Sequence, residues 1–320
     1  MAKANYLCLS LLILLLLKCS HSHSHPFNIL LPSDSLSSSS CPTHNPNLYY
    51  RPLIGILTHP GDGASGRLTN ATDVSYIAAS YVKFVESAGA RVIPLLYNEP
   101  QDTLLKKLDM VNGVIFTGGW SKKGLYYDTV QTVYKKVLEK NDGGDYFPLY
   151  AISLGFELIS IIISEDSNIL DDFTSSKQPI NLYLTQNAIS DGAMFQRFPP
   201  DLLKKVTTDC LVLQNNRYGL SPEGLLNNEK LSSFFEILTT SKDANNKKNA
   251  FEWGTKNVPH TEDAVRLTQS AANFLVSEAR KSSTRPDSQD VLDNLIYNYI
   301  PTYCGKAGKG YDQVYLFTQS

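Results

Sequence analysis

The sequence predicts an α/β fold in three layers, in which helices flank both faces of a parallel-rich sheet. Short apolar runs alternate with amphipathic segments through the first half of the chain, and turn residues separate them. This alternation is typical of strand–helix–strand units, whose strands pair in parallel. A second observation is that Gly-rich or Ser-containing loops follow two of the apolar runs. Because such sheets place their functional groups at the carboxyl ends of the strands, these loops are the first candidates for a site.

Each element of the first half follows from the spacing of its apolar residues. Residues 53–58 form a buried strand, because the apolar run is bounded by Pro52 and by a Pro/Gly-rich loop. Residues 74–88 have apolar side chains at helical spacing, and Gly89 ends this helix as a C-terminal cap. The same reasoning predicts strands at 91–96, 113–117 and 149–153 and helices at 103–108, 127–138 and 156–163.

The pattern changes after residue 163. Short β-like runs are expected at 182–185, 210–214 and 234–240, without long helices between them. Residues 264–280 then have the apolar spacing of an amphipathic helix. Residues 292–300 are predicted to form another helix.

The composition favours neither nucleic acid nor a membrane surface as a partner. The chain has 320 residues, 42% of them hydrophobic, which is ordinary for a globular protein with a full core. Lys and Arg number 29 against 31 Asp and Glu, so the net charge is -2. Proteins that bind nucleic acid or an anionic membrane usually carry a basic patch, which this balance does not supply.

The first 22 residues are typical of a secretory signal peptide. Lys3 precedes an apolar run at 7–17, which Lys18 ends. Spanning a bilayer takes roughly 20 residues, and this run is shorter than that. A membrane anchor is therefore the alternative to a signal peptide. We expect no membrane contact after the signal peptide is cleaved. Residues 23–49 are rich in Ser and Pro and are predicted to be a disordered mature N-terminus. The folded domain is then expected to span 50–320, in a protein of the secretory pathway.

Two kinds of covalent modification are open in an oxidising compartment. Removal of the signal peptide leaves Cys41, Cys210 and Cys304, which allow one disulfide with one free thiol or three unpaired cysteines. Asn70 begins the Asn-X-Thr sequence of an N-glycosylation site, within a polar stretch that is expected to be a surface loop.

Ser153 occupies the position of a nucleophile at a strand-to-helix turn. The strand at 149–153 runs directly into the helix at 156–163, which is the context of a strained nucleophile elbow. In that geometry the backbone N–H groups of Leu154 and Gly119 would bind an oxyanion, as acyl transfer requires. The alternative is that a glycine after the strand serves only the turn.

Several segments together resemble one known family. Residues 54–63, 76–83, 118–120, 154–158 and 249–254 are similar to the gamma-glutamyl hydrolases, in particular to their plant branch, and the resemblance extends from about residue 51 to the carboxyl terminus. It implies a fold like that of class I glutamine amidotransferases, without metal or cofactor. It also implies an often dimeric enzyme that removes gamma-linked glutamates from folylpolyglutamates, in the vacuole or outside the cell.

The chain departs from this family where the chemistry takes place. The family uses a Cys–His pair supported by a Glu, and its cysteine falls on Ser153. The His and Glu belong to a Trp-His-Pro-Glu segment directly before the stretch that corresponds to 249–254, but here residues 234–240 continue through 241–248 into that stretch. About two strands of family sequence are therefore absent, and we expect the sheet to lack one or two strands.

Three further positions are expected at the site through the resemblance. Asn216 stands where a substrate-contacting His is expected, and Asn cannot titrate. Glu157 lies one helical turn beyond Ser153, in contact with the site or in a supporting role. Tyr76 would contact bound substrate through its hydroxyl or, as the alternative, pack as a buried tyrosine.

Two histidines fall within the expected folded domain, and neither is expected to replace the missing base. His59 ends the first strand and is predicted to be a loop residue, and His260 is predicted to lie in a capping turn before the helix at 264–280. The remaining histidines fall in the signal peptide or the N-terminal segment.

The sequence thus predicts a relative of enzymes that hydrolyse the gamma-glutamyl bonds of folylpolyglutamates, itself inactive or strongly impaired. Three alternatives stay open. The chain could be a weak hydrolase that depends on Ser153, a non-catalytic subunit that binds polyglutamates as a homodimer or beside active members, or the product of a truncated transcript.

Overall fold

We describe the protein from a computed structural model. The structure describes residues 44–69, 71–173, 179–190, 193–213, 217–241, 249–304 and 310–318. Asn45–Ser320 form one compact unit. The expected signal peptide (1–22) and most of the expected N-terminal segment (23–49) lie outside the described residues.

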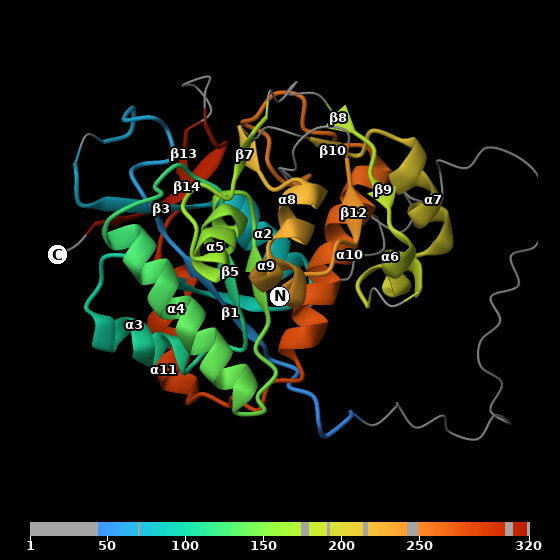
Figure 1. Cartoon of the computed structure of the whole chain (residues 1–320). Helices are drawn as coiled ribbons and strands as arrows, with labels where there is room; N and C mark the ends of the chain where they lie inside the picture. Colours follow the sequence, from blue (N-terminus) through green and yellow to red (C-terminus); the bar gives the residue numbers. More distant parts are fainter. Residues whose placement is uncertain are drawn as a thin grey trace, which may run out of the picture. The chain divides into compact units, whose positions relative to one another are not determined.

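A parallel sheet of four strands forms the centre of this unit (Figure 1). Its order is β4-β1-β5-β6, with β1 at Leu53–Leu57, β4 at Arg91–Leu95, β5 at Val114–Phe116 and β6 at Leu149–Ala151. All three strand pairs are parallel. The predicted α/β class and the predicted strands of the first half are therefore confirmed.

Alternate residues of β1 point to opposite faces of the sheet, and each face is covered by helices. Ile54 and Ile56 pack against α2 (Ala79–Ser87) and α10 (Glu262–Ala279). Leu53 and Leu57 belong to a second cluster, with α3 (Gln101–Leu108), α4 (Leu125–Asp142), α5 (Leu154–Ser164) and α11 (Ser288–Asn294). Helix, sheet and helix make the three predicted layers.

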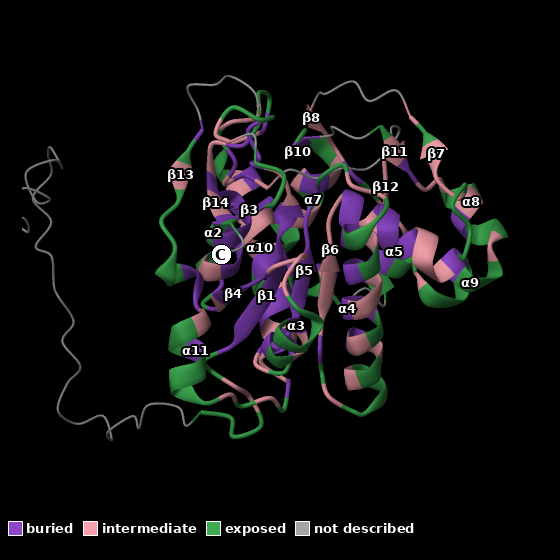
Figure 2. Cartoon of the chain, turned by 90° about the vertical axis from the view of Figure 1, so that its left-hand side faces the viewer, coloured by how far each residue is buried: buried purple, intermediate pink, exposed green. Residues whose placement is uncertain are grey.

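The parallel sheet ends at β6 in the part of the chain that the structure describes. All five residues of β1 are buried, whereas all three residues of β6 are only half-buried, as their colours in Figure 2 show. Within the described part of the chain, β6 pairs with β5 alone. A sheet that ends here agrees with the expected loss of one or two strands.

The predicted helix at 74–88 is only half correct. Val74–Ala78 form β3, and the helix α2 begins at Ala79. β3 lies in an antiparallel sheet of order β13-β14-β3-β2, with β2 at His59–Pro60, β13 at Thr302–Tyr303 and β14 at Gln313–Thr318. β14 pairs with all five residues of β3. Local periodicity missed this strand, because its partner comes from the other end of the chain.

The second half contains short elements around a smaller apolar cluster. Three two-stranded ladders join β7 (Asp171–Asp172) to β11 (Tyr218–Gly219), β8 (Pro179–Ile180) to β10 (Val212–Leu213), and β9 (Tyr183–Leu184) to β12 (Thr239–Thr240). The short helices among them are α6 (Gln186–Ser190), η1 (Phe195–Arg197), α7 (Pro200–Thr208), α8 (Pro222–Asn227) and α9 (Glu229–Phe234).

Two predictions for the second half need correction. The run at 234–240 is a strand only at Thr239–Thr240, because Phe234 ends helix α9. The helix expected at 292–300 stops at Asn294, and a 3-10 turn at Ile296–Asn298 follows. The reason is Leu295, whose extended backbone (ψ 148°) interrupts the helix.

Two observations bear on the modifications and on the membrane. Cys210 is exposed and Cys304 is buried, both as free thiols, and Cys41 lies outside the described residues. None of the helices in the described ranges is both long and apolar enough to cross a membrane.

Candidate functional site

Ser153 lies in the strained turn that the sequence predicts. It joins β6 to α5 with φ 57° and ψ -116°, a conformation that costs a residue other than glycine free energy. The turn leaves no room for a side chain at position 155, because a Cβ there would lie 2.6 Å from Phe116 Cβ. The Gly155 N–H donates to the Thr117 and Ile152 carbonyl oxygens. The geometry of a nucleophile elbow is therefore present around Ser153.

Two backbone N–H groups face the same region. Leu154 is the first residue of α5, so its N–H has no acceptor within the helix. This N–H lies at the positive end of the helix dipole. Gly119 lies between Gly118, whose N–H donates to the Tyr81 hydroxyl at 3.2 Å, and Trp120, whose N–H donates to His59. These contacts fix the loop on both sides of Gly119, and the role of Leu154 and Gly119 as oxyanion donors stays a prediction.

The loop at 118–121 separates Ser153 from His59. A Cβ on Gly118 would lie 3.3 Å from Ser153 Oγ, whereas a Cβ on Gly119 would overlap the His59 ring. The two consecutive glycines therefore face opposite sides of the loop. His59 therefore lies on one side of the loop that is predicted to hold the oxyanion, and Ser153 lies on the other side.

His59 is a buried strand residue, which corrects its predicted place in a loop. Its side chain is fully buried in β2, and both ring nitrogens are engaged. Nδ1 lies 2.8 Å from the Pro60 carbonyl oxygen and donates to it, while Nε2 accepts from the N–H groups of Trp120 at 3.1 Å and Ser121 at 3.3 Å. Burial lowers the pKa of His59 to about 4. His59 is thus a neutral ring that fixes the 118–121 loop.

Tyr76 lies under this loop among aromatic rings. Its ring contacts His59 edge-on at 5.6 Å and stacks below Trp120 at 6.3 Å. The side chain is buried, and its hydroxyl is hydrogen-bonded to Tyr311. Burial also raises the pKa of Tyr76 well above its ordinary value. These contacts match the packing alternative, while Trp120 is 60% exposed and covers the group.

His260 is also held away from Ser153. Its Nδ1 lies 2.9 Å from the Ala250 carbonyl oxygen, and its ring stacks on Trp253 with centroids 3.7 Å apart and an interplanar angle of 2°. The capping side chain of α10 is that of the next residue, Thr261, which accepts from Ala264 N–H. The predicted capping turn is therefore present, but His260 itself does not cap the helix.

Glu157 is bound by a lysine next to the site. Its side chain is buried one turn beyond Ser153, and its carboxylate lies 2.6 Å from Lys122 Nζ. The same ammonium group lies 3.7 Å above the centroid of the Tyr218 ring. A carboxylate paired in this way holds the loop that carries Lys122 against helix α5.

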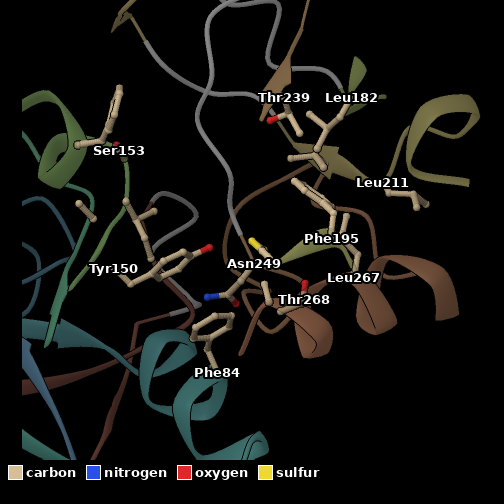
Figure 3. A pocket seen from close by; sticks show the side chains of 16 residues that line it. Phe84, Tyr150, Ser153, Leu182, Phe195, Leu211, Thr239, Asn249, Leu267 and Thr268 are labelled. Carbon is tan, nitrogen blue, oxygen red and sulfur yellow. The ribbon is translucent and has the colours of Figure 1, made fainter. Parts of the chain in front are cut away.

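A cavity of about 300 Å³ opens beside Ser153 (Figure 3). β6 and Ser153 form one wall, α2 and α10 form another, and the short strands of the second half form a third. The lining residues are Phe84, Tyr150, Ala151, Ile152, Ser153, Phe156, Leu182, Met194, Phe195, Leu211, Val212, Thr239, Asn249, Leu267, Thr268 and Ala271. Neither His59 nor His260 is among them.

Some predicted features cannot be placed. Asn216 and the sequon residue Asn70 lie outside the described residues. In the described ranges there is no group of three or more His, Cys, Asp or Glu side chains that could hold a metal ion.

The fold and the turn define the class: an α/β protein with a nucleophile elbow at the carboxyl end of a parallel strand. Residues 52–164 match the Peptidase C26 family. Gamma-glutamyl hydrolase 1 of Arabidopsis thaliana is 57% identical over an alignment of 317 positions, which takes in 91% of each chain. The gamma-glutamyl hydrolase of Glycine max is 58% identical over 314 residues, 91% of this chain and 92% of the relative. That of Bos taurus is 35% identical over 318 residues, 90% and 96% respectively. The chain belongs to the gamma-glutamyl hydrolase family.

The alignments also agree with an internal gap. The alignment with the Arabidopsis protein has 317 positions, more than the 91% of 320 residues that this chain contributes to it. The relative therefore has residues without a counterpart in this chain. The sequence places such a gap between the strand at Thr239–Thr240 and Asn249, where the family segment with its His and Glu is expected.

Two contacts of the site escaped the sequence reasoning. The Tyr81 hydroxyl accepts from Gly118 N–H, and the His59 ring accepts from Trp120 N–H. Both tyrosine and histidine lie in the segments that carry the family resemblance, but their acceptor roles depend on a loop that is distant in sequence.

Proposed function

We propose that this chain is a gamma-glutamyl hydrolase relative whose hydrolysis of the gamma-glutamyl bonds of folylpolyglutamates is lost or strongly reduced. One observation carries the proposal: the two histidines of the folded unit, His59 and His260, are both engaged elsewhere and neither lines the cavity at Ser153.

The chemistry explains why this matters. In acyl transfer the nucleophile's oxygen bonds to the carbonyl carbon and loses its proton, and the C–N bond breaks as the leaving nitrogen gains one. A serine hydroxyl depends on an adjacent base for the first proton transfer. His59 cannot supply that base, because its Nε2 lone pair accepts two backbone N–H groups and its pKa is about 4.

The elbow supports a role for the oxyanion side of the site. Ser153 has the backbone geometry of a nucleophile elbow, and the N–H groups of Leu154 and Gly119 are the predicted donors to a tetrahedral intermediate. This half of the machinery supports a second candidate function, the binding of gamma-glutamyl ligands without turnover, alone or as the partner of active family members.

Glutamate release from a pteroylpolyglutamate tests the proposal. The purified mature chain is expected to act at least on the order of 10⁴-fold more slowly than an equal amount of the Glycine max relative, because the base is missing. Ser153→Ala is the matched control, and we expect it to release no less glutamate than the parent chain. Turnover within about 100-fold of the relative, abolished by Ser153→Ala, would overturn the proposal.

Thermal melting in the same samples separates the two candidates. A ligand that binds only the native state raises the melting temperature, and the stabilisation grows with the logarithm of its concentration once that exceeds Kd. A rise without turnover would support the binding role, and no rise would restrict the proposal to loss of activity.

A further inference from the structure

The cavity beside β6 has an unusual lining for a protein whose family acts on polyanions. None of its sixteen lining residues is charged. Its polar side chains are Ser153, Thr239, Asn249 and Thr268, together with the hydroxyl of Tyr150. The nearby cation, Lys122, pairs with Glu157 outside the lining. Among the described lining residues, no side chain is a positive partner that would offset the desolvation of a carboxylate, so this lining favours an uncharged guest.

An aromatic platform lies on one wall of the cavity. The Tyr150 ring stacks parallel to Phe84, with centroids 5.6 Å apart and an interplanar angle of 7°. Tyr150 is only half-buried, and in Figure 3 its hydroxyl points into the cavity. That hydroxyl has no hydrogen-bond partner in the described part of the chain, and burial raises its pKa to about 12, so it stays protonated. It can donate a hydrogen bond to a guest.

The free edge of the sheet adds backbone groups to the same wall. Ile152 N–H donates to the Phe116 carbonyl oxygen, toward β5. Because backbone groups alternate along a strand, the N–H and C=O of Ala151 point the other way, to the side of the cavity. The wall therefore combines an apolar ring face with a few fixed hydrogen-bonding groups, as small-molecule sites do.

We propose that this cavity binds a neutral, flat aromatic molecule that stacks on Tyr150 and exchanges a hydrogen bond with its hydroxyl. The volume of about 300 Å³ suits a guest of two or three rings and lies at the lower end of the range for ligand sites. The proposal does not depend on catalysis at Ser153, so it survives whether or not the chain hydrolyses gamma-glutamyl bonds.

Two fluorescent probes with the same ring system test the charge requirement. N-phenyl-1-naphthylamine is neutral, and 8-anilinonaphthalene-1-sulfonate carries a sulfonate on the same framework. Titration of the full mature chain should give one site per chain, with Kd for the neutral probe at least about tenfold lower than for the sulfonate, because none of the described lining residues is a cation.

Variants of the lining test the location. Leu267→Trp should fill the cavity and weaken binding of the neutral probe at least about tenfold, and Tyr150→Phe should weaken it several-fold through loss of the hydrogen bond. Leu226→Trp is the matched control, because Leu226 is 64% exposed on α8 and does not line the cavity. If Leu267→Trp fails to melt cooperatively, Leu211→Phe, next to β10 in the cavity lining, replaces it.

Several outcomes would overturn the proposal. These are no binding of the neutral probe, equal affinity for both probes, more than one site per chain, or unchanged affinity in a folded cavity-filling variant. Exposed apolar surface in a loosely packed chain would bind the two probes with equal affinity and at more than one site.

Discussion

Ser153 and His59 lie on opposite sides of the 118–121 loop, and two adjacent glycines make this possible. Gly118 leaves space for the serine, and Gly119 leaves space for the imidazole ring. The ring in turn holds the loop by accepting from Trp120 and Ser121. His59 lies near the elbow as a catalytic histidine would, but its role here is that of a structural acceptor. Its Nε2 lone pair already accepts backbone N–H groups.

The contact between Gly119 and His59 can be measured as a coupling free energy in a double-mutant cycle. Gly119→Ala should lower the free energy of unfolding by about 1–3 kcal/mol, because the added methyl overlaps the buried ring. Urea denaturation measures the change. In a His59→Ala background the same substitution should cost much less, and equal effects in the two backgrounds would show that the ring is not the obstacle.

The lowered pKa of His59 predicts a pH dependence of stability. The folded chain keeps the ring neutral down to about pH 4, whereas the unfolded chain protonates it near its ordinary value of 6.5. The neutral ring therefore makes its full contribution to the free energy of unfolding above about pH 6.5. This contribution, on the order of 3 kcal/mol in all, is lost as the pH falls from there to about 4.

Urea denaturation between pH 7 and pH 4 tests this loss, with His59→Gln as the control that lacks the titrating ring. Asp62, whose pKa is lowered by four backbone N–H groups, contributes mainly below this window. Identical pH slopes in the parent and in His59→Gln would refute the assignment.

At the scale of elements, β6 is the place where the sheet stops. Among the described residues only β5 pairs with its backbone, and an open strand edge is a site for pairing or aggregation. The half-buried residues of β6 beside the fully buried residues of β1 reflect this position.

Hydrogen exchange distinguishes the two sides of β6. The Ile152 amide donates to Phe116 and should exchange slowly, whereas the Ala151 amide faces away from β5 and should exchange at least on the order of 10²-fold faster. Exchange followed by NMR, residue by residue, measures both. Equal protection of the two amides would mean that another strand covers this edge.

The elements that sequence reasoning predicted share a physical property. β1, β4 and β5 are buried on both faces, so each appears as a continuous apolar run that needs no knowledge of its neighbours. β3 could not be assigned in this way, because its identity as a strand depends on β14 from the far end of the chain. The Ser153 elbow was predictable from local sequence, and the acceptor role of His59 was not.

At the scale of the whole molecule, the described residues keep the packing of the family fold around the elbow. Both faces of the parallel sheet have apolar clusters, and the segment at 249–254 is tied to the C-terminal residues through Glu252, which accepts from Asp312 N–H at 2.8 Å. A loss of the family's chemistry, as we propose, would therefore leave this packing in place.

The pH dependence of alkylation in the Ser153→Cys variant tests most directly whether any base lies beside position 153. Iodoacetamide reacts with the thiolate, and peptide mass spectrometry separates this thiol from Cys41, Cys210 and Cys304. We expect the rate to rise with a midpoint above about pH 7, since only the start of α5 favours the anion. A midpoint below about pH 6, as a thiolate paired with an imidazolium gives, would contradict the absence of a catalytic base.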